Sequence, residues 1–384
     1  MNYRDFGKLG WKSSLLGMGC MRLPRVYNDS EKAEIDVEKA VELIGYAAEN
    51  GINYFDTAFS YHNGHSEEVL GLALDGGLRK KVKIVTKQPL NVMKTDDDIR
   101  RNLESTLKKL RTDFLDVYLI HNINAASWPT IRERDIIGKF EKFKEEGLIG
   151  AVGFSYHGGY NAFSEVLSYH DWDMCQLQQN ILDVNKEATE QAIHDAGKKG
   201  CALVIMEPLR GGGLAYAPPE VKELYKSLPE QRGEIEWAFR HLINYSEVSC
   251  ILSGVTALDQ LKENIEIFSK PDAVSGCLSD DEKAVMAKVK AVYESKASIP
   301  CTGCEYCMPC PSGINIPIIF SRYNEGIMFD NFSQPQRSYM LMGRANSRAS
   351  NCVSCGACES KCPQGIKIID ELKKSHEALK GWIE

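Results

Sequence analysis

Eight cysteines near the C-terminus stand in two runs of nearly equal spacing. In each run, three cysteines are separated by two residues, and a fourth is followed directly by proline. Iron–sulfur proteins hold 4Fe–4S clusters with this spacing, and the last cysteine of one run ligates the cluster of the other run. The pattern therefore predicts two such clusters. One is assigned to Cys301, Cys304, Cys307 and Cys362, and the other to Cys352, Cys355, Cys358 and Cys310.

Two other uses of these cysteines fit the spacing less well. A structural zinc site needs four ligands, usually two separated Cys-x-x-Cys pairs or a pair with histidines. Disulfides need an oxidising compartment and are typical of small secreted chains. The other five of the 13 cysteines are scattered among apolar residues, as buried thiols in a reducing compartment would be.

The segment between the two runs predicts helices rather than a short hairpin. The 41 residues from 311 to 351 contain two amphipathic stretches, at 316–323 and 336–342, and a third follows at 368–374. We therefore expect residues 299–384 to form a small α-helical dicluster domain. A connecting helix and linker at 276–298 should precede it.

Composition excludes several classes of protein. The 384 residues carry a net charge of −7 and contain no long basic run, so nucleic-acid binding is disfavoured. No apolar run approaches the roughly 18 residues that a membrane span needs. The N-terminus also lacks the apolar stretch of a signal peptide. We therefore expect a cytoplasmic protein with one large and one small domain.

Residues 1–275 alternate between strand-like and helix-like segments, after a predicted hairpin at residues 3–12. The predicted strands are at 15–20, 52–55, 82–86, 114–120, 149–154, 174–177, 202–206 and 249–252. The predicted helices are at 36–49, 66–75, 96–111, 134–146, 160–169, 187–199, 230–244 and 257–268. Eight such units most economically close into a parallel (β/α)₈ TIM barrel, an α/β fold. A doubly wound open sheet is the alternative, but no Gly-x-Gly-x-x-Gly follows the first strand.

Four polar side chains stand at the C-terminal ends of predicted strands, where TIM barrels carry their function. Asp56 and Tyr61 follow the second strand, Lys87 ends the third, and His121 ends the fourth. Each alone has a structural explanation, such as a buried ion pair or a hydrogen-bonded core histidine. Together they place a carboxylate, a phenol, an amine and an imidazole around the mouth of the predicted barrel.

These four residues resemble the catalytic tetrad of the aldo-keto reductase superfamily. The resemblance covers residues 1–275 and extends to three further stretches of the sequence. They are Phe55-Asp56-Thr57-Ala58, Val152-Gly153-Phe154-Ser155 and Glu263-Asn264. The cysteine-bearing tail resembles the subgroup with a fused 4Fe–4S ferredoxin-like domain. The resemblance implies NAD(P)H-dependent reduction of a small carbonyl substrate, or the reverse oxidation of an alcohol.

Carbonyl reduction needs a hydride at carbon and a proton at oxygen. A tyrosine phenol has an unperturbed pKa of about 10, and a neighbouring ammonium group lowers it. We therefore expect Tyr61 to be the general acid in reduction and the base in oxidation. Lys87 would lower the pKa of Tyr61, and Asp56 would hold Lys87 in place. His121, as a neutral donor, would orient and polarise the carbonyl oxygen.

The segment after the eighth strand departs from the family pattern for the nucleotide. Gly254 and Gln260 stand where the family usually has cations that grip the adenosine 2′-phosphate of NADPH. Backbone N–H groups at residues 254–256, which lead into a helix, can still bind a phosphate. We therefore expect NADPH to bind no better than NADH. The predicted contacts in this segment are Ser253, Gly254, Val255, Thr256, Gln260, Glu263 and Asn264.

Two further departures surround the expected nicotinamide. Tyr156 and His157 stand where the family often has an asparagine for the carboxamide, and Met206 replaces an aromatic stacking residue. Gln176 remains available for the carboxamide. The glycine-rich run after Met206 either cradles the pyrophosphate or only makes a tight turn. The predicted contacts here are Ser155, Gln176, Pro208, Leu209, Arg210, Gly211 and Gly213.

Two other functions stay open at this stage. In one, the barrel binds nicotinamide or a flavin, and the clusters exchange electrons with a ferredoxin or another redox protein. In the other, the chain is an electron carrier or scaffold with an idle barrel, which the complete tetrad argues against. Hydride transfer moves two electrons and a cluster moves one, so a flavin is a further candidate cofactor.

Overall fold

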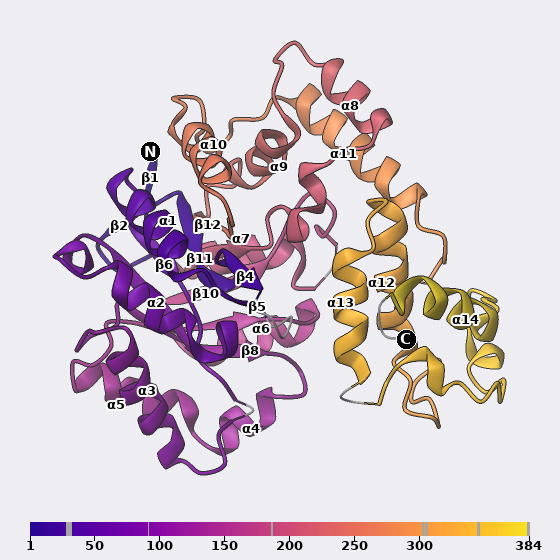
Figure 1. The fold of residues 1–384 in the computed structure, drawn as a ribbon, viewed down its shortest axis with the longest axis horizontal. Helices are drawn as coiled ribbons and strands as arrows, with labels where there is room; N and C mark the ends of the chain where they lie inside the picture. Colours follow the sequence, from indigo (N-terminus) through magenta and orange to yellow (C-terminus); the bar gives the residue numbers. More distant parts are fainter. Residues whose placement is uncertain are drawn as a thin grey trace. The chain divides into compact units, whose positions relative to one another are not determined.

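The computed structural model describes residues 1–27, 33–90, 92–185, 187–301, 303, 306–343 and 346–381. These residues form two compact units. The first comprises Met1–Pro208 and Ile235–Ser279, and the second comprises Leu209–Glu234 and Asp280–Glu384. The described strands all lie in the first unit (Figure 1).

The first unit contains a closed barrel of eight parallel strands, as the sequence predicts. The strands are β3 (Leu16–Gly19), β6 (Tyr54–Asp56), β7 (Lys83–Gln88), β8 (Val117–Ile123), β9 (Val152–Tyr156), β10 (Met174–Gln178), β11 (Ala202–Met206) and β12 (Val248–Ser253). They follow one another around the barrel in chain order, and β12 pairs with β3. Because parallel neighbours need crossover connections, a helix lies between each pair of successive strands. The barrel helices are α1 (Val37–Glu49), α2 (Ser66–Ala73), α3 (Asp97–Lys109), α5 (Ile136–Glu145), α6 (Tyr160–Tyr169), α7 (Thr189–Lys198), α9 (Glu234–Ile243) and α10 (Leu258–Ser269).

Three short elements accompany the barrel. The antiparallel pair β1 (Tyr3–Asp5) and β2 (Lys12–Ser14) confirms the predicted N-terminal hairpin. The pair β4 (Arg25–Tyr27) and β5 (Ala33–Ile35) and the helix α4 (Trp128–Glu133) are not predicted from the sequence.

The N-terminal hairpin closes the end of the barrel at which the strands begin. The Phe6 ring stacks on Trp11 at 4.1 Å and lies 5.4 Å from the ring of Tyr54, the first residue of β6. Phe6 and Trp11 pack with the apolar cluster that fills the interior of the barrel. Its buried members are Phe6, Tyr54, Val85, Val117, Leu119, Ala151, Met174, Ala202, Val204, Cys250 and Leu252. The polar strand ends are therefore left at the opposite mouth.

Helix α3 shows how a local sequence pattern gives a barrel helix. Ile99, Leu103 and Leu107 recur every four residues and are buried, whereas most positions between them are charged or polar. Acidic side chains occupy the first turn and two lysines the last. This arrangement complements the helix dipole.

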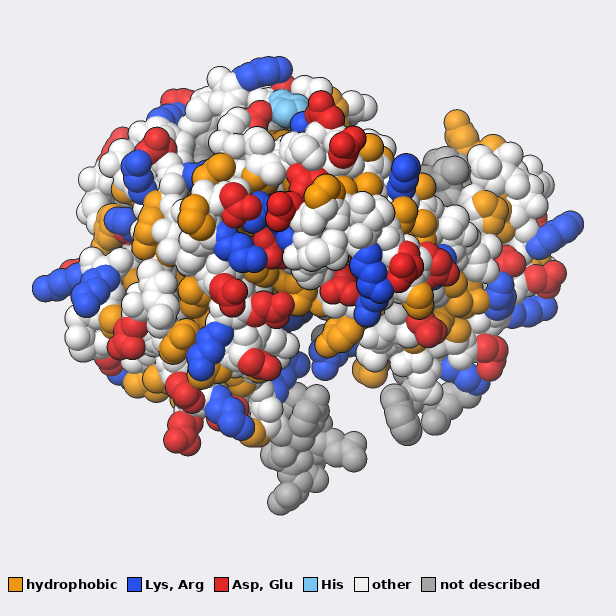
Figure 2. All heavy atoms as spheres, turned by 90° about the horizontal axis from the view of Figure 1, so that it is seen from above, with side chains coloured by type: hydrophobic (Ala, Val, Ile, Leu, Met, Phe, Trp, Pro, Cys, Tyr) orange, Lys and Arg blue, Asp and Glu red, His pale blue; other side chains and the backbone are white. Residues whose placement is uncertain are grey.

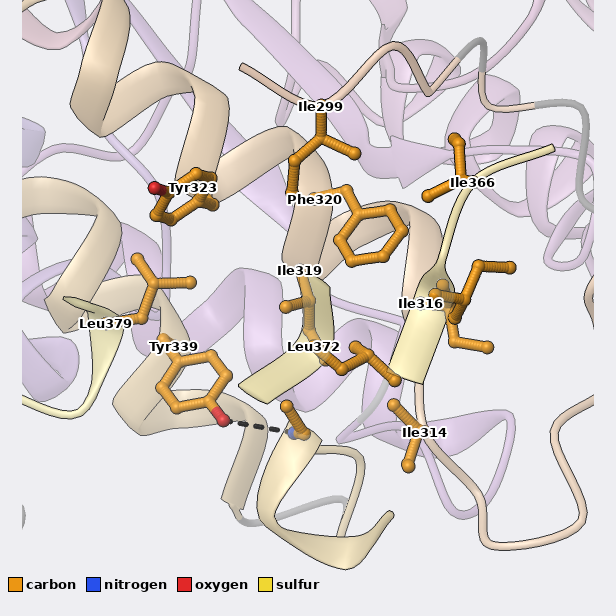
Figure 3. Packing of buried hydrophobic residues seen from close by; sticks show 12 residues of the cluster. Ile299, Ile314, Ile316, Ile319, Phe320, Tyr323, Tyr339, Ile366, Leu372 and Leu379 are labelled. Atoms are coloured by element: carbon orange, nitrogen blue, oxygen red, sulfur yellow. Dashed lines mark hydrogen bonds between the residues drawn. The ribbon is translucent and has the colours of Figure 1, made fainter. Parts of the chain in front are cut away.

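The second unit is helical and has its own apolar core (Figure 3). Its helices are α8 (Pro219–Lys226), α11 (Asp280–Ser295), α12 (Ile316–Met328), α13 (Ser333–Met342) and α14 (Ile368–Leu379). The predicted helical character of the C-terminal region is confirmed. At the edge of the core, the Tyr339 hydroxyl accepts the Ala349 N–H at 3.0 Å. The buried members of the core are Ile299, Ile314, Ile316, Ile319, Phe320, Tyr323, Tyr339, Ala349, Ile366, Ile368, Leu372 and Leu379.

Residues 209–234 group with the second unit, although the sequence analysis assigns them to a barrel domain ending at residue 275. Helix α8 packs against α11. Arg232 pairs with Glu282, and both side chains are largely buried. The connection after β11 is long because it supplies a helix to the second unit.

Charged side chains of both signs are scattered over one face of the molecule. On the face that Figure 2 displays, Lys and Arg side chains lie intermingled with Asp and Glu. Such charges cancel over short distances. Among the described residues, no helix has both the length and the apolar character that crossing a bilayer requires.

Two glycines in barrel helices give a test of this packing. At Gly71 on α2, a Cβ atom would lie 2.4 Å from the Lys109 carbonyl oxygen, whereas at Gly45 on α1 nothing lies within 4 Å. We expect Gly71→Ala to lower the free energy of unfolding by about 1–3 kcal/mol through overpacking. Gly45→Ala should raise it by about 0.5–1 kcal/mol through helix propensity. Denaturant titration of the two variants beside the wild type checks this order, and an equal effect of both would contradict it.

Candidate active site and cluster ligands

A buried ion pair joins the ends of the neighbouring strands β6 and β7. The Lys87 Nζ lies 2.6 and 2.7 Å from the two Asp56 carboxylate oxygens, and it donates to the Thr57 carbonyl oxygen at 2.7 Å. Lys87 is 0% exposed and Asp56 is 2% exposed. Burial would lower the pKa of Lys87, but the Asp56 carboxylate raises it above its usual value. Lys87 is therefore a fixed cation at neutral pH.

Tyr61 lies next to this cation. It begins the 3₁₀ turn η2 (Tyr61–Gly64), in which His62 and Asn63 take left-handed φ angles of 51° and 57°. The Lys87 Nζ is 5.0 Å from the centre of the Tyr61 ring. Burial raises the pKa of the Tyr61 phenol above its usual value, and the Lys87 cation opposes this rise. Lys87 acts on this pKa in the expected direction, but burial is the larger influence, so the net direction is upward.

A β-bulge at the end of β8 sets the position of His121. The β8–β9 register shifts between Ile120 and Ile123, and Asn122 has a left-handed φ of 58°. The Asn122 N–H donates to the Ser155 hydroxyl at 2.8 Å. Bulges of this kind redirect a side chain at the rim of a barrel. Ser155, predicted as a cofactor contact, therefore also holds the bulge that carries His121.

His121 and Tyr61 face one another at the mouth of the barrel. Their ring centres are 6.1 Å apart, with an angle of 78° between the ring planes. Burial, followed by the charge of Lys87, lowers the pKa of His121 to about 3. The imidazole is therefore neutral at physiological pH and can donate one hydrogen bond. This agrees with the neutral-donor role expected from the sequence.

Gln176 on β10 fits the carboxamide of a nicotinamide. The residue is 1% exposed, and its Nε2 lies 3.6 Å from the Met206 sulfur. Its Oε1 is buried and has no hydrogen-bond partner among the described residues. A buried acceptor of this kind is costly unless it is paired. A ligand amide that donates to Oε1 would satisfy it.

Three cysteines predicted to hold one cluster line a single cavity in the second unit. Cys301, Cys307 and Cys362 border one small cavity of about 20 Å³, and most of the other lining side chains are apolar. Cys304, the fourth predicted ligand, lies outside the described residues. A cavity walled by thiols and apolar groups fits a buried 4Fe–4S cluster.

The other predicted set also comes together across the two runs. Cys352 and Cys310 both lie within electrostatic reach of Cys358 and help to raise its pKa, after burial. Cys355 is exposed. In the described part of the chain, no three His, Cys, Asp or Glu side chains are grouped as around a single metal ion. A cube of four irons instead spaces its thiolates around a larger centre.

Comparison with known protein families agrees with this geometry. The model described as the aldo/keto reductase family matches residues 15–274. The chain belongs to the aldo/keto reductase family. The model of the 4Fe-4S dicluster domain matches residues 300–366. The chain is thus an oxidoreductase of the aldo-keto reductase type with a C-terminal dicluster domain.

Individual relatives of this aldo/keto reductase cover only part of the chain. An uncharacterized oxidoreductase of Bacillus subtilis (strain 168) is 25% identical over 298 residues, which are 69% of this chain and 90% of the relative. A probable aldo-keto reductase of Glycine max is 29% identical over 214 residues, which are 54% of this chain and 59% of the relative.

Solved structures show the same fold. The holo form of an aldo-keto reductase from Bacillus halodurans has a TM-score of 0.62 at 27% identity, covering 75% of this chain and 96% of its own. An aldo-keto reductase from Klebsiella pneumoniae in complex with NADPH has a TM-score of 0.60, covering 76% of this chain and 96% of its own. At 19% identity the second likeness shows the fold alone.

In this aldo/keto reductase, side chains of α10 hold the loop after β12. Asn264 is buried and donates to the Ser253 hydroxyl oxygen at 2.9 Å. Gln260 accepts the Thr256 N–H at 3.0 Å and the Thr256 hydroxyl at 3.3 Å. The Thr256 N–H, predicted to bind a phosphate, is thus already paired, and a phosphate there would have to displace Gln260. Of the other predicted contacts here, Val255 is buried and Glu263 is exposed.

Two cations lie close to this loop, Lys262 on α10 and Arg22 after β3. Lys262 places its Nζ 5.6 Å from the centre of the Tyr46 ring on α1. A Cβ atom on Gly254 would lie 3.5 Å from the Cβ of Arg22, whose guanidinium pairs with Glu207 at 2.9 Å. The strand order β11–β12–β3 brings Arg22 and Glu207 to either side of the loop. No local pattern marks this pair, because its partners are far apart in the sequence.

The glycine-rich run after Pro208 has a packing role inside the second unit. A Cβ atom on Gly211 would lie 2.1 Å from the Gln334 side chain, and one on Gly213 would lie 3.1 Å from the Phe329 ring. Arg210 places its guanidinium carbon 5.8 Å from the centre of the same ring. Because these glycines have no side chains, Gln334 of α13 and Phe329, which follows α12, can lie close to the backbone of the run. Contact of Arg210, Gly211, Gly213 and Leu209 with a pyrophosphate stays a prediction.

The cysteine assignment predicts a specific loss of iron. Anaerobically prepared protein should contain about eight iron and eight sulfide per chain. Cys362→Ser should remove about half of the iron, because Cys362 lines the cavity of the first run. Cys175→Ser, which changes a buried thiol on β10, should keep all of it. Iron and sulfide analysis checks this result, and stoichiometric zinc without iron would contradict it.

Proposed function

We propose that the barrel catalyses NAD(P)H-dependent reduction of a small carbonyl substrate, or the reverse oxidation of an alcohol. The observation that carries the proposal is the contact series of Asp56, Lys87, Tyr61 and His121. A buried ion pair, a phenol 5.0 Å from its cation and a neutral imidazole meet at the mouth of the barrel. Family membership supports the same chemistry.

The proton transfer follows from the pKa directions. Since burial raises the pKa of Tyr61, its phenol is protonated at neutral pH and can give its proton to the carbonyl oxygen as hydride reaches the carbon. The Lys87 ammonium stabilises the phenolate that remains. Neutral His121 donates a hydrogen bond to the same oxygen and orients it. A bound nicotinamide supplies the hydride, and Gln176 would hold its carboxamide.

The nucleotide site supports NADH at least as well as NADPH. Gly254 and Gln260 provide no charge for a 2′-phosphate, and Lys262 lies over the Tyr46 ring. A phosphate dianion without a cationic partner loses hydration and gains little in return. Arg22 is already engaged by Glu207.

The second unit would hold two 4Fe–4S clusters, with Cys301, Cys304, Cys307 and Cys362 on one and the remaining four cysteines of the runs on the other. Such clusters store and pass single electrons when bound. The thiol-lined cavity supports this assignment. A ferredoxin or similar redox protein is the partner that this chemistry suggests.

The proposed role of Tyr61 can be tested directly. Tyr61→Phe should lower kcat for aldehyde reduction by about 10²–10⁴-fold, because only the proton donor is lost. The control is Tyr156→Phe, since the Tyr156 hydroxyl donates to the Gly159 carbonyl oxygen and not to a group at the mouth of the barrel. Rates are measured with NADH and NADPH over a panel of small aldehydes. Full activity of Tyr61→Phe would show that the chemistry lies elsewhere.

Removal of Lys87 should shift the pH dependence upward. Because the Lys87 cation opposes the rise in the pKa of Tyr61, Lys87→Met should raise that pKa further. Alcohol oxidation, which needs the phenolate, should then begin at higher pH than in the wild type. The double variant Asp56→Asn/Lys87→Met leaves no unpaired buried charge and controls for misfolding. A pH–rate profile unchanged in both variants would contradict the electrostatic role.

A further inference from the structure

Tyr61 lies in the loop of residues 57–65, which joins β6 to α2. The three residues after Tyr61 all have left-handed φ angles, 51° at His62, 57° at Asn63 and 94° at Gly64. Such angles cost a residue other than glycine about 1–3 kcal/mol, and they persist only where the surrounding structure holds them. The position of the phenol therefore depends on the contacts that hold this loop.

Lys109, the last residue of α3, contacts the loop on both sides of Tyr61. Its Nζ donates to the Gly64 carbonyl oxygen at 3.1 Å, and it lies 4.5 Å from the centre of the Phe59 ring. An ammonium group at this distance is attracted to the face of an aromatic ring. Phe59 stands two residues before Tyr61, and Gly64 stands three residues after it. One side chain thus joins the two arms of the loop.

Glu67, the second residue of α2, holds Lys109 from the interior. It is 0% exposed, and its Oε1 accepts the hydroxyls of Thr86 at 2.8 Å and Thr106 at 3.0 Å. Its Oε2 lies 3.5 Å from the Lys109 Nζ as an ion pair and has no hydrogen-bond partner among the described residues. Thr86 directly precedes Lys87 on β7. The loop contact of Lys109 is therefore anchored to the strand that carries the catalytic cation.

The base of the loop is held by other contacts, which do not involve Lys109. The Thr57 hydroxyl donates to the Ser66 hydroxyl at 2.9 Å, and the Ser66 hydroxyl donates to the Cys20 carbonyl oxygen at 2.9 Å. The Thr57 carbonyl oxygen also accepts the Lys87 ammonium at 2.7 Å. Removal of Lys109 should therefore loosen the middle of the loop and leave the barrel folded.

We propose that Lys109, held by Glu67, is a positioning residue that fixes Tyr61 for proton transfer. Lys109 contacts the backbone and the Phe59 ring of the loop, so it acts on the phenol through the loop. A displacement of a reacting group by about 1 Å can lower a rate by about 10²-fold. The inference rests on the proposed function, in which Tyr61 gives its proton to the carbonyl oxygen.

The test removes the ammonium group and keeps the length of the side chain. Lys109→Met should lower kcat for aldehyde reduction by about ten- to a hundredfold, with a smaller change in KM. Lys109→Arg should restore most of the rate, because a guanidinium can donate to the same carbonyl and lie over the same ring. Glu67→Gln keeps an acceptor for the two threonine hydroxyls and removes only the charge, so it should cause a smaller loss of kcat.

The neighbouring residue of α3 provides a matched control. Lys108 and Lys109 both lie in the last turn of the helix, so each substitution by methionine removes the same charge from its C-terminus. Lys108 is exposed. Lys108→Met should leave kcat unchanged, and an equal loss in the two variants would overturn the proposal. Thermal unfolding and iron content confirm that each variant folds.

A double variant separates positioning from a general effect on the fold. In the Tyr61→Phe background, Lys109→Met should cause no further loss of kcat, because the ring then has no proton to position. The same fold-change in both backgrounds would overturn the proposal.

Fluorine NMR of protein labelled with 3-fluorotyrosine gives a readout that does not need activity. The Tyr61 signal, identified by its loss in Tyr61→Phe, should shift or split in Lys109→Met and stay in place in Lys108→Met. If the wild type reduces no aldehyde, the proposed function is refuted, and the positioning of Tyr61 is judged from this signal. A Tyr61 signal of the same shift and width in wild type and Lys109→Met overturns the positioning.

Discussion

The buried Lys87–Asp56 pair is the interaction on which the chemistry of the barrel depends. Two charges in an apolar interior cost several kcal/mol of hydration each unless their geometry is good. Here the ammonium group has three oxygen acceptors within 2.7 Å, two from Asp56 and one from the Thr57 backbone. The pair therefore fixes the ends of β6 and β7 relative to each other. The segment that carries Tyr61 begins from this fixed point.

The Lys87 cation also influences the protonation of the two other polar groups at the mouth of the barrel, Tyr61 and His121. It stabilises a phenolate at Tyr61, and it disfavours a second positive charge at His121. Burial acts with the cation at His121 and against it at Tyr61. The resting site thus holds a protonated phenol and a neutral imidazole, which are both hydrogen-bond donors. One lysine and the surrounding apolar packing set these protonation states together.

The sequence predicts those features that depend on local pattern. The eight strands are readable because each is an apolar run, and the tetrad is readable because its members stand where such runs end. The cysteine ligands are readable from spacing. The bulge at Asn122 is not, because it depends on a hydroxyl from the next strand. The net direction of the pKa of Tyr61 is also not readable, because it depends on how completely folding excludes water from the ring.

The glycine-rich run is a clear case in which two interpretations of one pattern could not be separated in advance. Gly211 and Gly213 suit a phosphate cradle by type and spacing. Their contacts with Gln334 and Phe329, more than 100 residues later in the sequence, appear only when the chain is folded.

The grouping of residues 209–234 with the second unit makes that unit discontinuous in sequence. The chain enters it after β11, returns to the barrel for β12 and α10, and enters it again at α11. A ribosome completes α8, which ends at Lys226, about 70 residues before it completes α11, which ends at Ser295 and packs against α8. Cutting the gene at the apparent linker near residue 298 would also separate the glycine run from Phe329 and Gln334. The cysteine-rich tail therefore cannot be separated from the barrel at that linker without dividing the second unit.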